Sequence, residues 1–218
     1  VESKRGFLYA AMSNEACKAE LDRREIPYAL EPETKQIDLP LRFTGPVRGV
    51  EYRLTERGLK DPEKTSPAAV LDCRLALAID DFSRVLAKND IATVEYMSMY
   101  RKRGVGFVKP GKRHPSGRAI DVATLIKRDG TKLSVRGDWH GRVGSKTCGE
   151  GAAEPYKSTL AAHQMRAIVC ETAAIGPRSD IFALGGTQRL SAFAPGWVTA
   201  PSWAGPTIWA NFQMAPEL

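Results

Sequence analysis

The chain of 218 residues is poor in the residues and patterns that mark several common protein classes. It has three histidines, and none follows His163. It has no apolar run approaching the roughly 20 residues of a membrane-spanning helix, so we expect no membrane span. None of its four cysteines stands in a Cys-x-x-Cys pair, which argues against a structural zinc knuckle. What remains is a chain of ordinary globular composition, 43% hydrophobic and 26% charged, long enough for one hydrophobic core.

A positive net charge of +7 favours polyanionic surroundings. Seven basic residues gather in one part of the sequence, at Arg101, Lys102, Arg103, Lys109, Lys112, Arg113 and Arg118. Aromatic residues are not interleaved among them, as a stacking platform for nucleic acid would require. The cluster is therefore read as a funnel for an acidic substrate or as a solvated loop, and nucleic acid is disfavoured as a partner.

One segment has the spacing of a metal site. His114 is followed by Gly117 and, seven residues after the histidine, by Asp121. An imidazole nitrogen and a carboxylate oxygen can meet at one Zn²⁺ ion, about 2.0–2.2 Å from each. A turn made flexible by Gly117 and followed by a strand would bring both side chains to the same point.

Local patterns predict separate groups of helices and strands. Helices are expected from Ser13 or Asn14 to Arg24, over an apolar face from Leu75 to Leu86, and after a cap at Ser158. Strands and the Asp129-Gly130 hairpin turn are expected over 36–43, 47–54, 92–100, 117–126 and 131–136, with loops over 55–67 and 104–116. The fold class predicted is α+β, with a mainly antiparallel sheet and flanking helices.

The chain resembles the bacterial extensin-like C-terminal family, which is related to the zinc D-Ala-D-Ala carboxypeptidases and peptidoglycan amidases. Lys112 stands where the carboxypeptidase motif has a serine. Besides His114–Asp121, the resemblance rests on the segments 71–76 (LDCRLA), 96–101 (YMSMYR), 138–141 (DWHG) and 147–149 (TCG).

The resemblance implies a carboxypeptidase-like fold, with His114 and Asp121 as zinc ligands and Arg101 as the residue that binds a substrate carboxylate. The planar guanidinium group of an arginine can bind both oxygens of a carboxylate at once.

Four cysteines allow three pairings, and their even number and wide spacing fit two disulfides in an exported protein. Four free thiols in a cytosolic protein are the alternative. The resemblance implies the pairs Cys17–Cys73 and Cys148–Cys170, and with them a location in the periplasm or cell envelope.

The predicted zinc site lacks a third ligand. Catalytic zinc needs three protein ligands, and the family supplies the third, with the general base, from a C-terminal histidine motif. We therefore divide the chain into a domain over 1–173 and an atypical tail over 174–218, which has no histidine but contains Trp197, Trp203 and Trp209.

Three interpretations of the tail stay open. In the first, the tail replaces the catalytic segment of the family, and the domain binds its ligand without catalysis. In the second, the tail results from a change of reading frame, so the catalytic segment is lost. In the third, the third zinc ligand comes from elsewhere in the chain. His140 and His163 are then the remaining imidazoles, with His140 a third ligand or a residue that supports the ligands.

The expected function is that of an exported, peptidoglycan-associated protein with an incomplete zinc site. If active, it would be a zinc-dependent peptidoglycan amidase or D,D-peptidase-like hydrolase. The alternative is a non-catalytic protein that binds the cell wall or another polyanion.

Overall fold

Helix α4 (Cys73–Lys88) is the helix against which three other helices pack. Its apolar residues recur at helical spacing, as the sequence predicts, and the Asp72 carboxylate caps its first turn by accepting the Arg74 backbone N–H at 3.0 Å. Polar residues of α4 are buried as well, among them Asp80 and Ser83. The computed structural model describes residues 5–55, 66–101, 114–142, 145–175, 185–186 and 211–212.

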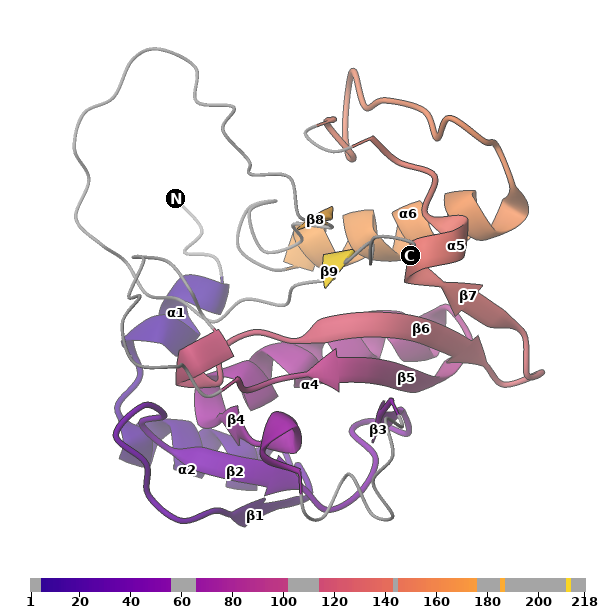
Figure 1. Ribbon diagram of the computed structural model, residues 1–218. Coiled ribbons are helices and arrows are strands. Elements are labelled where there is room, and N and C mark those ends of the chain that lie inside the picture. Colours follow the sequence, from indigo (N-terminus) through magenta and orange to yellow (C-terminus); the bar gives the residue numbers. More distant parts are fainter. Residues whose placement is uncertain are drawn as a thin grey trace, which may run out of the picture.

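The main sheet has four strands in the order β3-β5-β6-β7, and α4 lies against β5 (Figure 1). Its strands are β3 (Glu51–Leu54), β5 (Ile91–Ser98), β6 (Asp121–Lys127) and β7 (Lys132–Ser134). β3 and β5 run parallel, with α4 in the connection between them, whereas the pairs β5–β6 and β6–β7 are antiparallel.

A smaller antiparallel sheet has the order β1-β2-β4. Its strands are β1 (Tyr28–Leu30), β2 (Pro40–Phe43) and β4 (Leu71–Asp72). The class is therefore α+β with flanking helices, as predicted, and the main sheet is mixed because of its parallel β3–β5 pair.

Helices α1 (Arg5–Ala11), α2 (Asn14–Arg23) and α6 (Leu160–Ile175) all contact α4. The short helix α5 (Val135–Asp138) contacts α6 and β6, and the 3-10 turns are η1 (Pro67–Ala69) and η2 (His114–Ser116). None of the helices in the described ranges is long and apolar enough to cross a membrane.

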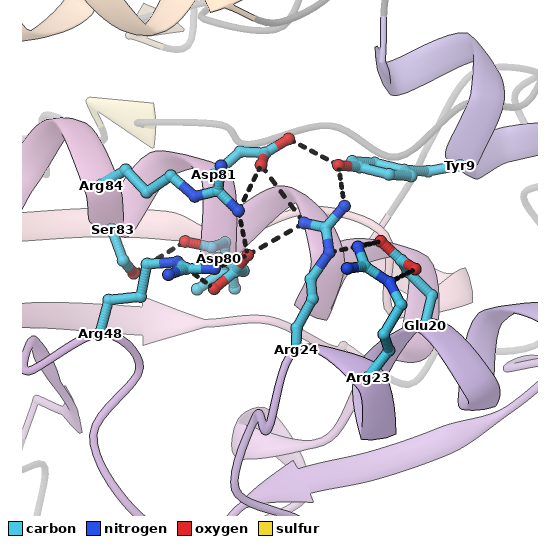
Figure 2. Close-up of polar contacts among 10 residues, drawn as sticks. Tyr9, Glu20, Arg23, Arg24, Arg48, Asp80, Asp81, Ser83 and Arg84 are labelled. Atoms are coloured by element: carbon cyan, nitrogen blue, oxygen red, sulfur yellow. Dashed lines mark hydrogen bonds and ion pairs between the residues drawn. The ribbon is translucent and has the colours of Figure 1, made fainter.

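A buried polar cluster joins α1, α2 and the turn before β3 to α4 (Figure 2). We call it the Asp80 cluster; its side chains are Tyr9, Glu20, Arg24, Arg48, Asp80, Asp81 and Arg84. Arg24 lies 2.9 Å from Asp80, and the Tyr9 hydroxyl donates to Asp81 at 2.6 Å. Burial first, and then Asp81, raises the pKa of Tyr9 to about 12, so this hydroxyl keeps its proton as a donor.

Several predicted boundaries change for local reasons. Strand β2 starts at Pro40 rather than at residue 36, because the Thr34 hydroxyl accepts the backbone N–H groups of Gln36 and Ile37 in a turn. The cap of α6 is Thr159 and not Ser158, since Thr159 accepts the Ala162 N–H at 3.1 Å. The predicted strand 131–136 ends at Ser134, whose hydroxyl caps α5.

Both predicted disulfides are confirmed. Cys17 of α2 is bonded to Cys73 of α4, and Cys148 is bonded to Cys170 of α6. Most of the predicted loops 55–67 and 104–116 and most of the tail over 174–218 lie outside the described residues. Within the tail, β8 (Gly185–Gly186) pairs in parallel with β9 (Asn211–Phe212), which contacts β6.

Candidate functional site

The candidate site is built where β5 ends and β6 begins. Ser98 is the last residue of β5, Asp121 is the first of β6, and the two are partners in the antiparallel register. Directly opposed strand residues bring their side chains close on one face of the sheet. The Ser98 hydroxyl accordingly donates to Asp121 Oδ2 at 3.2 Å.

His114 reaches the same point from the η2 turn, which Gly117 closes. Gly117 has a φ of +64°, a conformation that L side chains rarely adopt, and its N–H donates to the His114 carbonyl at 3.1 Å. A Cβ on Gly117 would lie only 2.9 Å from the backbone nitrogen of Asp72. The turn that carries His114 is thus packed directly against β4.

Asp121 receives donors on both carboxylate oxygens. His114 Nε2 lies 3.1 Å from Oδ1, and the Arg101 guanidinium is ion-paired with Oδ2. Arg101 Nε also donates to the Ser98 hydroxyl at 2.8 Å. The convergence of His114, Asp121 and Arg101 predicted from the sequence is therefore observed, whereas their roles as metal ligands and carboxylate binder stay predictions. Ser98 completes the Asp121 cluster, which we define as Ser98, Arg101, His114 and Asp121.

Burial determines the charge states within the Asp121 cluster. Asp121 is fully buried, so its carboxylate needs a compensating cation, and Arg101 supplies it. The Arg101 side chain is 43% exposed, so the cation sits between the buried carboxylate and solvent. Burial first, and then the Arg101 charge, lowers the pKa of His114 to about 4, against an opposing effect of the Met99 backbone. His114 is consequently neutral near pH 7, and the cluster carries no net charge.

The donors present fall short of a catalytic zinc site. His114 and Asp121 are of the right chemical type, and they face one another. Across the described ranges, however, no group of three His, Cys, Asp or Glu side chains lies close enough together to hold a metal. Since catalytic zinc takes three protein ligands, and since a guanidinium already occupies Asp121, the described residues do not fit this ion.

The other two histidines have partners of their own. His140 Nδ1 lies 3.4 Å from the Tyr156 hydroxyl, and the two rings make an edge-to-face contact with centroids 5.3 Å apart. His163 lies exposed on α6, with Nε2 2.6 Å from the Ser158 hydroxyl. Neither histidine joins His114 and Asp121 in a three-ligand group of the part of the chain that is described.

Arg118 does not belong to an open basic surface. It is buried, it is ion-paired with Asp38, and its Nε lies 3.5 Å from Asp72. It therefore secures the Gly117 turn to the smaller sheet instead of attracting an acidic substrate. Residues 102–113, which hold the other basic side chains of the predicted funnel apart from Arg101, lie outside the described residues.

Sequence reasoning assigned no role to Ser98, although its hydroxyl links Arg101 to Asp121. The available signal is its spacing: it lies within the predicted strand 92–100, three residues before Arg101. The pairing of Ser98 with Asp121 depends on the strand register, which spacing within one segment does not reveal.

Comparison with known proteins places the chain in a family. Neither the curated proteins nor the solved structures include a significant match to the chain. A family model described as "Extensin-like protein C-terminus" matches residues 15–167, which run from α2 to the middle of α6 and include the whole Asp121 cluster. Because the match covers more than half of the chain, the protein belongs to the extensin-like protein C-terminus family.

Proposed function

We propose that this chain is an exported, cell-envelope protein that binds peptidoglycan, or another anionic wall polymer, at the Asp121 cluster without hydrolysing it. The proposed fold relationship is with the zinc D-Ala-D-Ala carboxypeptidases and peptidoglycan amidases. Export is supported by the two disulfides, because such bonds persist in oxidising compartments.

The observation that carries the proposal is the geometry of Arg101. Its side chain reaches solvent while its Nε and one terminal nitrogen are anchored on Ser98 and Asp121. Guanidinium has five N–H donors in a planar fork, and Ser98 and Asp121 take only part of them among the described residues. The others can bind a carboxylate of a wall peptide. Because His114 is neutral, the Arg101 guanidinium is the one positive charge of the Asp121 cluster.

Binding to isolated peptidoglycan sacculi tests the proposal. We expect the oxidised protein to cosediment with sacculi and Arg101→Ala to lose at least half of that binding. Arg128→Ala removes an equally charged side chain, 57% exposed on the β6–β7 turn, and should bind as the unaltered protein does. An equal loss of sacculus binding in both variants would show that the protein is attracted by its overall positive charge, and it would refute a specific role for Arg101.

A second candidate function is zinc-dependent hydrolysis of a peptidoglycan amide or peptide bond. It is favoured by the 3.1 Å approach of His114 Nε2 to Asp121 Oδ1, which brings two donors of the right kind together. Incubation with muropeptides and Zn²⁺ separates the two functions. Under the binding proposal, mass spectrometry shows intact muropeptides; cleavage that disappears in His114→Ala would establish the hydrolase instead.

A further inference from the structure

We infer that the Arg101 guanidinium is the resident cation of the Asp121 cluster and occupies the place where a metal ion would bind, so that the site is metal-independent. This inference rests on the proposed relationship to the zinc carboxypeptidases and amidases. It goes beyond the proposed function by naming the group that prevents a metal ion from binding. It concerns only residues that the structure describes.

Both oxygens of the Asp121 carboxylate already have donors. Oδ1 faces His114 Nε2 at 3.1 Å, and Oδ2 receives both the Ser98 hydroxyl, at 3.2 Å, and the Arg101 guanidinium. A metal ion bound by Asp121 would have to displace at least one of these donors. Because Asp121 is fully buried, water cannot take over a donor's role without the cluster opening.

The charge of the Asp121 carboxylate is already compensated. One fully buried carboxylate is matched by one guanidinium. A divalent cation added beside Asp121 would leave two positive centres next to one carboxylate in a poorly solvated place. Like charges at such short range repel strongly where solvent screening is weak.

Arg101 is held in position by contacts beyond its ion pair with Asp121. Its Nε donates to Ser98 at 2.8 Å, and its backbone N–H donates to the His114 carbonyl at 3.4 Å. The side chain therefore starts from a short, anchored segment next to β5. Displacement of the guanidinium would break the Ser98 contact together with the ion pair.

Zinc titration of the intact, oxidised chain tests the inference. We expect Arg101→Gln to bind Zn²⁺ at least tenfold more tightly than the unaltered protein in isothermal titration calorimetry, because Asp121 then lacks its cation. Arg101→Lys is the matched control: it keeps a positive charge near Asp121 and should gain little affinity. Adding His114→Ala to Arg101→Gln should abolish the gain, which locates the bound ion at this cluster.

Thermal unfolding provides a readout that does not depend on measurable titration heats. Without metal, Arg101→Gln should melt at a lower temperature than the unaltered protein, and excess Zn²⁺ should recover part of that loss. Unchanged zinc affinity in Arg101→Gln, or tight one-to-one binding by the unaltered protein, would overturn the inference. Sacculus binding is measured separately, so failure of the proposed function would appear in cosedimentation and not in the zinc titration.

Discussion

At the scale of single residues, Gly117 shows how a backbone requirement supports the candidate site. Its N–H holds the His114 carbonyl, its carbonyl accepts the Asp72 N–H at 2.9 Å, and its α-carbon lies close to β4. No other residue type offers both the positive φ and the missing Cβ that this contact demands.

Gly117→Ala should therefore lower the free energy of unfolding by about 2–4 kcal/mol, from backbone strain together with the clash on Asp72. Gly130→Ala is the matched control. Gly130 also has a positive φ, of +86°, but a Cβ there meets nothing within 4 Å, so strain alone should cost about 1 kcal/mol. Urea unfolding measures both, and equal losses would contradict the close packing of Gly117.

His114 should make the protein sensitive to mild acid. In the unfolded chain it takes up a proton as the pH falls below 6.5, whereas in the folded chain it stays neutral down to about pH 4. The free energy of unfolding should thus fall by about 2 kcal/mol between pH 7.5 and pH 5. His114→Gln should show a smaller loss over that window in urea titrations, and a pH dependence equal to that of the unaltered protein would argue against a buried, neutral His114.

At the scale of elements, α4 owes its position to polar contacts as well as to its apolar residues. Asp80 is 1% exposed and lies 2.6 Å from Arg48 and 2.9 Å from Arg24, so two other segments are tied to the helix through one carboxylate. Arg48 has a φ of 50°, unusual for a residue with a side chain. Its ion pair with Asp80 helps to hold that turn.

Asp80→Asn should destabilise the protein by about 3–5 kcal/mol, because the buried Arg24 and the partly exposed Arg48 both lose a compensating charge. Arg84→Ala removes another partner of Asp80, but that side chain is 43% exposed and should contribute less than about 1 kcal/mol. Chemical denaturation compares the two variants. A large effect of Arg84→Ala, or none of Asp80→Asn, would show that the Asp80 cluster is held by its exposed rim.

At the scale of the whole molecule, the two disulfides join segments that are distant in the sequence. Cys17–Cys73 spans 56 positions and links α2 to α4, while Cys148–Cys170 spans 22 and secures the segment before α6. In the chain-entropy model, the longer loop gives the larger restriction of the unfolded chain.

Replacing Cys17 and Cys73 together by serine should cost about 4 kcal/mol of unfolding free energy, and the Cys148 and Cys170 pair about 3 kcal/mol. The first pair is fully buried as well, so serine hydroxyls there add a desolvation cost. Thermal melts of both double variants check the order. A greater loss from the Cys148–Cys170 pair would show that loop length is not the controlling factor.

Much of this molecule follows from local sequence, because local interactions determine helix faces, caps and turns. The apolar spacing over 75–86 predicts α4, and Asp129-Gly130 forms the turn between β6 and β7. Of the two expected start residues of α2, Ser13 is the cap. The spacing of His114 and Asp121 likewise predicts their convergence. The family resemblance, rather than spacing, supplied the correct disulfide pairs.

Only the tertiary structure decided the features that depend on contacts between distant segments. The parallel pairing of β3 with β5, the ion pair of Arg101 with Asp121 and the burial of Arg118 involve partners separated by many residues. The sequence alone does not show whether a charged side chain faces solvent or neutralises a buried carboxylate. Burial and register settle that choice, since they determine which charges must be compensated within the protein.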